Sequence, residues 1–358
     1  FTFYMDCSTQ YLPYEKTGFF SKIVQDYLQQ HENLKPFYLH NTNLSGVQSA
    51  MNARDLHPVN RSVLVEELTL QYQGIAITPK VQEHIQSLLL PNAYTITTAH
   101  QPNIFTGPLY FIYKIIHTIK LASELGEKFP EKKFIPVYYM GSEDADLDEL
   151  GFVHIGGEKL VWNTAQTGAV GRMKVDKAFI TLIHSISGQI GVLPFGNELT
   201  QLFSTCYTVG KTIQQATLEL VNALFGSYGL IVLVPDNARL KSLFAPIIEK
   251  ELTEQFSQQI VAKTISQLQV NYKVQAAGRP INLFYLIDDK RERIEFKDGV
   301  YSVVDLNIQF TKEAILQELQ DHPERFSPNV ILRGAFQESI LPNIVFIGGG
   351  ERGVPWSR

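Results

Sequence analysis

Hydrophobic residues recur at helical spacing through the first quarter of the chain. The segments FFSKIVQDYL and VLVEELTLQY place apolar side chains three and four residues apart, which is typical of amphipathic helices. His57-Pro58 lies between them, and a proline and the residue before it both disfavour helix. Residues 18–90 are therefore predicted to form a mostly helical layer.

Short apolar runs with a different pattern follow, and these are typical of buried strands. Three lie at residues 94–99, 134–140 and 230–234, each followed by a polar loop and a helical segment, and one more lies at 342–347. The helix after the first strand is predicted from Leu109 to about Leu125. Strands that alternate with helices form parallel sheets. The sequence thus predicts an α/β protein with a Rossmann-like parallel sheet, in which ligands bind beyond the carboxyl ends of the strands.

The spacing of these strands predicts the domain organisation. About 80 residues separate the second and third strands, more than one crossover helix needs. Residues 1–150 are predicted to hold the helical layer and the first half of the core, 151–225 an insertion, and 226–358 the second half of the core. This last part includes a β-meander within 270–304, with turns at Asp288-Asp289 and Asp298-Gly299. It is expected to end early, because no helix follows to cover the strand at 342–347.

Composition and charge exclude several classes of protein. The 358 residues carry 31 Lys and Arg against 36 Asp and Glu, so no positive excess is available for a nucleic-acid backbone. No apolar run approaches the length of a membrane span, and the amino terminus lacks the pattern of a secretory signal. Cys7 and Cys206 are too few for a disulfide framework or a cysteine zinc site, and Cys206 is predicted to pack in the core. We therefore expect a cytoplasmic protein without nucleic-acid or membrane partners.

The loop after the first strand is the first candidate site. It is neither a Walker A sequence nor a dinucleotide fingerprint. Thr106 is predicted to cap the next helix, with Pro108 in its first turn, which would leave backbone N–H groups for an anion. The alternative is a capped loop with a hydrogen-bonded histidine. The candidates from this loop are His100, Gln101, Asn103, Thr106 and Gly107.

The helix that follows this loop carries a polar stripe. Tyr110, Lys114 and His117 are spaced to lie on one side of it. Such stripes usually face solvent, but this helix begins at the candidate site. Tyr110 and Lys114 are therefore further candidates.

An acidic segment follows the second strand. Its carboxylates are Glu143, Asp144, Asp146, Asp148 and Glu149. Close carboxylates bind a divalent metal, hold an ammonium group or act as a general base. Alternatively, Ser142 caps a helix whose first turn the acidic residues stabilise. Glu143, Asp144 and Asp146 are expected to face inward, with Asp148 and Glu149 in solvent.

The last candidates lie on either side of the final strand. Arg333 has the geometry to bind a carboxylate through two hydrogen bonds. Ser327-Pro328 is alternatively a plain helix start. Glycines after the strand permit a close approach to a ligand, although glycine runs also form simple turns. The candidates are Asn329, Arg333, Gln337, Gly348, Gly349 and Gly350.

Taken together, several segments of the chain resemble the BshC family of bacillithiol synthesis, described as cysteine ligases. They are HQPNIFTGPLYFIYK at 100–114, GSEDADLDEL at 141–150, INLFYLIDDKRERI at 281–294 and RFSPNVILRGAFQESILPNIVFIGGGE at 325–351, with PYEKTGFFSKIVQDYL at 13–28 as an opening segment. The order and spacing of these blocks match over nearly the whole chain. The family continues into a dimerising coiled coil, whereas RGVPWSR follows Glu351 here. The coiled coil is therefore expected to be absent or incomplete in this chain, and a homodimer is expected if the coiled coil is present.

The resemblance implies a fold and a reaction. The fold is a core similar to class I aminoacyl-tRNA synthetases, so residues 151–225 would be a connective-peptide insertion. The reaction is amide formation between the carboxyl group of L-cysteine and the amine of glucosaminyl-malate. A carboxylate needs activation for this, which implies ATP with Mg²⁺ and an acyl phosphate or an acyl adenylate. The sequence does not distinguish these two intermediates, and neither a proper HIGH sequence nor a KMSKS-like loop is present.

Under this resemblance each candidate group has an expected role. His100 with Thr106 and Gly107 would contact the activated carboxyl or a phosphate. The acidic group would hold a substrate ammonium or Mg²⁺, and Asn329 and Arg333 would bind the malate carboxylates. Two alternatives remain open at this point. One is a nucleotidyltransferase or sugar-nucleotide enzyme on the same fold, and the other is a non-catalytic scaffold of the thiol pathway.

Overall fold

The amino-terminal part of the protein is a layer of short helices. The computed structural model describes residues 10–274 and 277–349. This layer consists of α1 (Tyr14–Thr17), α2 (Lys22–Leu28), η1 (Glu32–Phe37), α3 (Leu44–Asp55), α4 (Arg61–Gln71) and α5 (Pro79–Ser87). Asn43, Asn60 and Thr78 cap α3, α4 and α5 by accepting a backbone N–H. His57-Pro58 falls between α3 and α4, so the helical prediction for residues 18–90 is confirmed.

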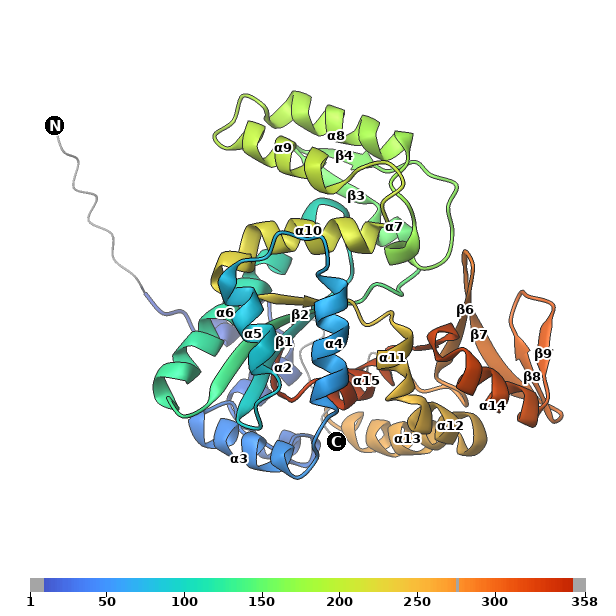
Figure 1. Cartoon of the computed structure of the whole chain (residues 1–358). Helices are drawn as coiled ribbons and strands as arrows, with labels where there is room; N and C mark the ends of the chain where they lie inside the picture. Colours follow the sequence, from blue (N-terminus) through green and yellow to red (C-terminus); the bar gives the residue numbers. More distant parts are fainter. Residues whose placement is uncertain (1–9, 275–276, 350–358) are drawn as a thin grey trace.

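A four-stranded sheet forms the centre of the molecule (Figure 1). Its strands are β1 (Ala93–His100), β2 (Lys133–Met140), β5 (Ile231–Leu233) and β11 (Asn343–Ile347), in the order β11-β1-β2-β5. All three pairings are parallel, with Thr97 opposite Val137 and Val137 opposite Ile231. Both the four strands and the parallel Rossmann-like sheet are confirmed.

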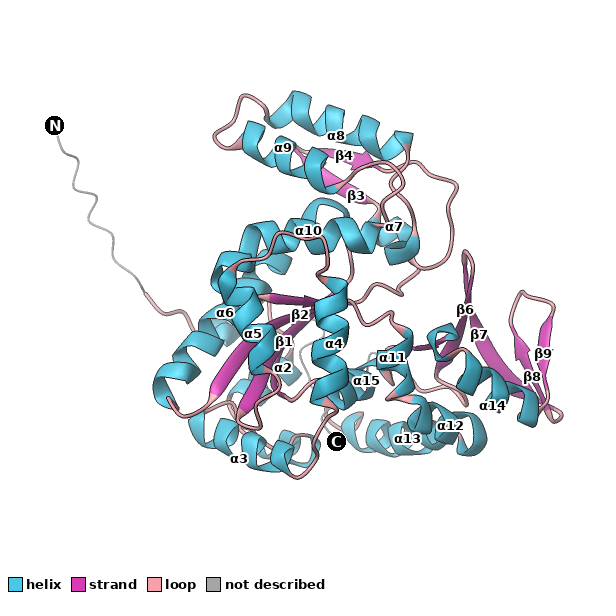
Figure 2. Ribbon diagram, in the orientation of Figure 1, coloured by secondary structure: helices cyan, strands magenta, loops and turns pink. Residues whose placement is uncertain are grey.

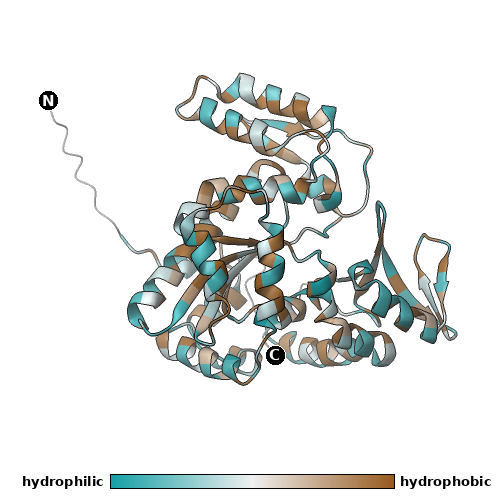
Figure 3. Ribbon diagram, viewed as in Figure 1, coloured by the Kyte–Doolittle hydropathy of each residue, from teal (hydrophilic) through white to brown (hydrophobic). Residues whose placement is uncertain are grey.

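Helices from the amino-terminal layer and the strand connections cover this sheet. Met51 of α3 and Leu125 of α6 (Tyr110–Lys128) pack with Tyr94, Ile96 and Phe134 in one hydrophobic cluster. Side chains of α4 and α5 pack with β2 and β5 in a larger cluster. Figure 3 shows hydrophobic residues where the strands lie and mixed polarity on the helices around them. Burial of the strands on both sides explains their nearly continuous apolar sequences.

The segment after β2 builds a lobe with a separate hydrophobic cluster. It comprises α7 (Leu147–Leu150), β3 (Phe152–Ile155), β4 (Glu158–Val161), η3 (Val170–Arg172), α8 (Lys177–Ile190), α9 (Gly196–Cys206) and α10 (Ile213–Phe225). Trp162, Phe179 and Tyr207 are fully buried in this cluster. Cys206 packs there too, as predicted, and burial raises the pKa of its thiol to about 11. In Figure 1, α8, α9, β3 and β4 of this lobe lie on the far side of α10 from the parallel sheet.

A second sheet follows, and it is antiparallel (Figure 2). Its strands are β6 (Leu283–Ile287), β7 (Lys290–Lys297), β8 (Val300–Val303), β9 (Ile308–Phe310) and β10 (Phe326–Pro328), in the order β10-β6-β7-β8-β9. The turns predicted at Asp288-Asp289 and Asp298-Gly299 are confirmed. Ser327-Pro328 as a helix start is wrong, because both residues pair with β6 as part of β10.

Further helices lead into β5, connect the two sheets, or join β9 to β10. They are η4 (Gly226–Tyr228), α11 (Ala238–Ser242), α12 (Ala245–Glu254), α13 (Phe256–Leu268), α14 (Lys312–Asp321), η5 (Pro323–Arg325) and α15 (Arg333–Ile340). Helix α15 begins beside the antiparallel sheet and leads into β11 of the parallel sheet. No helix in the part of the chain that the structure describes is long and apolar enough to cross a membrane.

Candidate functional site

The loop after β1 brings its histidine to the carboxyl end of the sheet. His100 is the last residue of β1, is buried, and packs between the rings of Tyr110 and Phe111. Its Nδ1 lies 3.0 Å from the carbonyl oxygen of Gln101. The Gln101 side chain donates to Asp144 Oδ2 at 2.9 Å, so the loop after β1 contacts the loop after β2. The two loops therefore meet at the carboxyl end of the sheet.

Thr106 does not cap a helix, and that prediction is wrong. It lies in η2 (Ile104–Thr106), and α6 starts at Tyr110 without a side-chain cap. Phe105, Thr106 and Gly107 all have positive φ, at 51°, 73° and 62°. A Cβ on Gly107 would lie 2.5 Å from the Cβ of Asn103, so only glycine fits. Asn103, Thr106 and Gly107 thus determine the shape of the loop.

Phe105 attaches this loop to the neighbouring lobe. Its ring lies 5.1 Å from Phe179, 4.8 Å from Phe203 and 5.3 Å from Tyr207, centre to centre. Aromatic pairs at such distances contribute beyond their buried area. A change in the lobe would therefore be transmitted directly to the loop that follows His100.

The two candidates on α6 lie at different depths. Tyr110 is about half exposed, next to the ring of His100. Lys114 donates to the carbonyl oxygen of Ala99, the residue before His100, and its ammonium lies 5.9 Å from the Tyr110 ring. Both residues therefore border the end of β1.

The acidic segment divides between the interior and the surface. Glu143 is buried and forms an ion pair with Lys241, whereas Asp144 is partly exposed. Asp146 is exposed and caps α7 by accepting the N–H of Glu149 at 3.3 Å. The expectation that Asp146 faces inward is wrong. Asp146, and not Ser142 as the alternative had it, is the residue that caps α7.

Lys241 belongs to a buried ion-pair network that the sequence reasoning missed. Its ammonium pairs with Glu143, lies 3.5 Å from Asp236 Oδ1 and donates to the Glu324 carbonyl oxygen at 2.8 Å. Arg172 in turn binds Asp236 through two hydrogen bonds, at 2.6 and 2.7 Å. Asp236 follows β5. The rule that ligands bind beyond the carboxyl ends of parallel strands could therefore have identified it from the sequence. No local signal marks Arg172 or Lys241.

The pKa of Asp236 reflects this setting. Burial raises the pKa, but the hydrogen bonds from Arg172 and the charges of Lys241 and Arg172 outweigh burial and hold it below the ordinary value of 3.8. The carboxylate is therefore ionised at neutral pH and keeps both cations in place.

Of the candidates near the last strand that the structure describes, Arg333 is the one that contacts the acidic segment. Its Nη1 lies 4.0 Å from Asp144 Oδ2. Asn329 is engaged elsewhere, donating to Asn282 Oδ1 at 2.9 Å and accepting the Ile331 N–H. Gln337 is buried one turn further along α15 and donates to Glu338 at 3.3 Å.

Gly348 and Gly349 follow β11 at the same end of the sheet as His100, and Gly350 lies outside the described residues. We call the side chains that meet at this end the charged cluster. Its members are Glu143, Asp144, Arg172, Asp236, Lys241 and Arg333.

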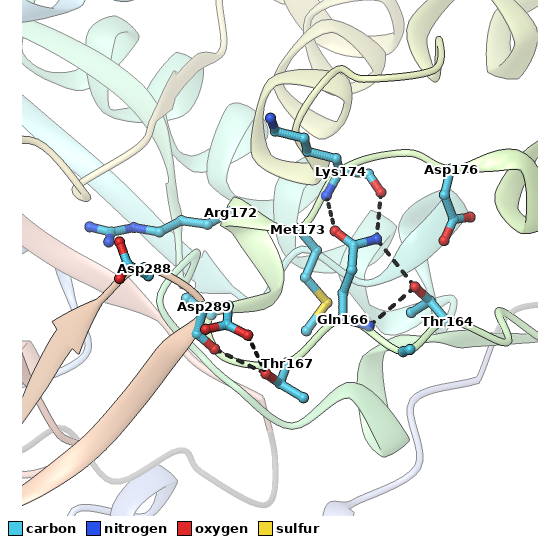
Figure 4. Close-up of a pocket in the computed structure, with 11 residues that line it drawn as sticks. Thr164, Gln166, Thr167, Arg172, Met173, Lys174, Asp176, Asp288 and Asp289 are labelled. Atoms are coloured by element: carbon cyan, nitrogen blue, oxygen red, sulfur yellow. Dashed lines mark hydrogen bonds between the residues drawn. The ribbon is translucent and has the colours of Figure 1, made fainter. Parts of the chain in front are cut away.

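A cavity of about 660 Å³ borders the charged cluster (Figure 4). It lies between residues 164–176 and the turn of β6 and β7, and Arg172 belongs to both cavity and cluster. In Figure 4, Gln166 bonds to the backbone of Lys174, and Thr167 donates to Asp289 at 3.1 Å. The cavity is large enough for a small-molecule substrate.

The charged cluster is not arranged as a metal site. Glu143 and Asp144 already have partners in Lys241, Gln101 and Arg333. Among residues 10–274 and 277–349, no group of three or more His, Cys, Asp or Glu side chains is placed to hold a metal ion. These carboxylates therefore do not fit the role of Mg²⁺ ligands.

Comparison with known proteins identifies the family. Residues 5–352 match the family model "Bacillithiol biosynthesis BshC, N-terminal Rossmann-like domain". The chain is 43% identical to "Putative cysteine ligase BshC" of Flavobacterium johnsoniae, 39% to that of Flavobacterium psychrophilum and 38% to that of Christiangramia forsetii. Each match covers 97% of this chain and 66% of the relative. The chain therefore belongs to the BshC family and matches its Rossmann-like domain over nearly its whole length.

Proposed function

We propose that this domain is the catalytic core of a ligase that joins L-cysteine to glucosaminyl-malate in bacillithiol biosynthesis. The names of the relatives support a cysteine ligase. The observation that carries the proposal is the charged cluster, which gathers three carboxylates and three cations beyond the carboxyl ends of β1, β2 and β5. Ligands of Rossmann-like sheets bind at this end.

The chemistry requires an activated carboxyl and a neutral amine. The amine of glucosaminyl-malate attacks the activated carbonyl carbon of cysteine, the new C–N bond forms, and the leaving group departs with the bonding electron pair. The nitrogen must lose a proton in the process. Asp144 is the carboxylate suited to hold the amine and accept that proton, because it is partly exposed and Gln101 fixes its orientation at 2.9 Å.

Other residues act on the carboxyl side of the reaction. His100 lies at the end of β1, where it can stabilise negative charge on the carbonyl oxygen or the leaving group. Glu143 forms an ion pair with Lys241 and helps to hold the charged cluster together. It is therefore not a free carboxylate that could bind a substrate. ATP is the proposed source of activation. Production of ADP would indicate an acyl phosphate, and production of AMP an acyl adenylate.

A reaction with each component omitted tests this function. Mass spectrometry should detect bacillithiol only when cysteine, glucosaminyl-malate and ATP are all present. Product that forms without cysteine, or nucleotide transfer to a sugar, would instead support a nucleotidyltransferase. Binding of substrates without any turnover would support a scaffold.

Asp144→Asn tests the proposed proton acceptor. Its amide keeps the size of the side chain but cannot accept a proton, so turnover should fall about 10²- to 10⁴-fold with an unchanged unfolding temperature. Asp148→Asn is the matched control, since Asp148 is exposed on the same acidic segment. Equal turnover in both variants would remove Asp144 from the mechanism.

A further inference from the structure

Two consecutive carbonyl groups at the end of β1 lie beside one buried hydroxyl. Tyr138 of β2 is fully buried and pairs with Thr98, two residues before His100. Its hydroxyl donates to the carbonyl oxygen of His100 at 3.1 Å and to that of Gln101 at 3.4 Å. Burial raises the pKa of Tyr138 well above its ordinary value of 10.0. The hydroxyl therefore keeps its proton and remains a hydrogen-bond donor.

The carbonyl group of Gln101 determines the tautomer of the His100 imidazole. Nδ1 of His100 lies 3.0 Å from this carbonyl oxygen, and a carbonyl oxygen can only accept a hydrogen bond. Nδ1 therefore carries a proton, and Nε2 is the nitrogen that gains or loses one. The turn of the chain that Tyr138 contacts thus fixes both the tautomer and the orientation of the ring.

The same turn orients the carboxylate to which we assign proton transfer. The side chain of Gln101 donates to Asp144 Oδ2 at 2.9 Å. A displacement of the Gln101 backbone would therefore move the amide that holds this carboxylate. His100 and Asp144 come from different loops, but both are attached to the two residues whose carbonyl groups the Tyr138 hydroxyl contacts.

Ring contacts connect Tyr138 to the imidazole by a second route. The centre of its ring lies 5.1 Å from that of Phe111, and the centre of the Phe111 ring lies 5.1 Å from that of His100. Both pairs are edge-to-face, an arrangement that aromatic rings favour. A phenylalanine at position 138 would keep these contacts. The hydroxyl is therefore the part of Tyr138 that can be tested separately from its packing.

We propose that the hydroxyl of Tyr138 is a positioning group for the ligase reaction, because it holds the turn that sets the His100 imidazole and, through Gln101, the Asp144 carboxylate. This inference rests on the proposed function and adds to it a residue that acts through these two side chains without touching a substrate. Tyr138 lies in a central strand of the sheet, so it fixes the turn to the most rigid part of the fold.

The hydroxyl is not needed to satisfy either carbonyl group. The carbonyl oxygen of His100 also accepts the N–H of Gly141 at 2.7 Å, and that of Gln101 accepts the N–H of Asn103 at 2.9 Å. These two donors belong to the loops themselves, whereas Tyr138 belongs to a strand. Loss of the hydroxyl leaves no buried acceptor without a donor, which is the costly case. It should therefore change the geometry of the turn more than the stability of the fold.

Steady-state kinetics of bacillithiol formation test the proposal. Tyr138→Phe keeps the ring and removes only the hydroxyl. Its kcat should fall about ten- to a hundredfold, because a small displacement of reacting groups is costly, while KM for each substrate should stay within about twofold of the parent value. The unfolding temperature should remain close to that of the parent.

Tyr301→Phe is the matched control. Tyr301 is also buried, in β8, and its hydroxyl donates to the carbonyl oxygen of Leu252 at 2.9 Å. Leu252 lies in the last turn of α12, where carbonyl groups have no following turn of the same helix to bind. Tyr301→Phe should therefore lower the unfolding temperature by a few degrees and leave kcat unchanged. The two variants lose the same atom but should differ oppositely in turnover and stability.

Nuclear magnetic resonance of protein with isotope-labelled histidine gives a readout that does not depend on turnover. His100→Gln identifies the signals of His100. In the parent, these signals should show the neutral imidazole protonated on Nδ1. In Tyr138→Phe they should shift or broaden as the contact with Gln101 loosens, whereas Tyr301→Phe should give the parent spectrum.

The outcomes distinguish the inference from the function on which it rests. Unchanged kcat in Tyr138→Phe, or unchanged His100 signals, would overturn the positioning role and leave the ligase proposal intact. A lower kcat accompanied by the same loss of unfolding temperature as in Tyr301→Phe would also overturn it, because the hydroxyl would then only support the fold. If the parent forms no bacillithiol, the ligase proposal fails, and the His100 signals still decide whether Tyr138 holds the imidazole.

Discussion

Asp236 shows how one buried carboxylate organises the residues of the site. Its side chain is only 3% exposed and contacts Arg172 and Lys241, which come from different parts of the chain. Lys241 in turn holds Glu143. Removal of one partner from such a network leaves another charge buried without compensation, which is costly. The arrangement of the charged cluster therefore depends on Asp236 being ionised.

The lowered pKa of Asp236 predicts how stability changes in acid. A carboxyl whose pKa is lower in the folded state contributes stability above its ordinary pKa of 3.8, and this contribution is lost as the pH falls through the folded-state value. Urea unfolding between pH 6 and pH 3 should show a smaller loss of unfolding free energy in Asp236→Asn than in the parent. Asp148→Asn, on the surface, should follow the parent. Parallel curves for parent and Asp236→Asn would contradict this account.

At the scale of elements, the connection from β1 to α6 is unusual. It joins a buried strand to a helix with one buried face through three consecutive residues with positive φ, Phe105, Thr106 and Gly107. Non-glycine residues rarely adopt this conformation, so surrounding contacts must maintain it. The aromatic contacts of Phe105 supply this support. Contacts with the lobe therefore maintain the conformation of the loop that follows His100.

Gly107→Ala should disrupt this connection. Its φ of 62° with ψ of −139° is accessible essentially to glycine alone, and an added Cβ would meet Asn103 at 2.5 Å. We expect a loss of at least about 2 kcal/mol in unfolding free energy, together with lower turnover. Gly126→Ala in α6 is the control, because nothing lies within 4 Å of its added Cβ. That variant should be neutral or more stable, as alanine favours helix.

At the scale of the whole molecule, the lobe and the antiparallel sheet contact each other across the cavity. Thr167 donates to Asp289, and Lys290 donates to Thr167 at 3.2 Å. Gly168 is so close to this turn that a Cβ would lie 2.2 Å from the Asp289 carbonyl oxygen. Arg172, four residues further on, binds Asp236 beside the parallel sheet. One short segment thus joins three parts of the fold around the site.

Gly168→Ala should separate the lobe from the antiparallel sheet. Gly157→Ala is a close control, since Gly157 has a similar φ of 87° but no atom within 4 Å of an added Cβ, whereas Gly168 has a φ of 83° and the contact with Asp289. Both variants incur backbone strain, but only Gly168→Ala should increase hydrogen exchange in residues 286–291. Equal hydrogen exchange in the two variants would show that the contact between Gly168 and Asp289 does not hold the lobe against the antiparallel sheet.

Much of the fold followed from local patterns. The helical layer, the four parallel strands and the turn at Asp288-Asp289 were predicted because periodicity and turn residues act over a few positions. β9 and β10 were missed, since each has only three residues and no clear alternation. Among the candidates, the position of His100 and Asp144 near one end of the sheet followed from a local signal, polar residues at strand ends, and their part in catalysis stays a prediction. The roles predicted for Thr106 and Asp146 were wrong. Thr106 lies in a loop with positive φ angles and does not begin a helix, and Asp146 caps α7 at the surface.

The sequence by itself determined which segments form the sheet, which of its ends carries polar loops, and through motif order which family the chain resembles. Only the tertiary structure decided the partner of each charge. Lys241 pairs with Glu143, and Arg172 with Asp236. The partners of each pair lie far apart in the sequence, and local periodicity gives no information about such contacts. Electrostatic pairing depends on distance in space and on burial, and both arise only when distant segments pack together.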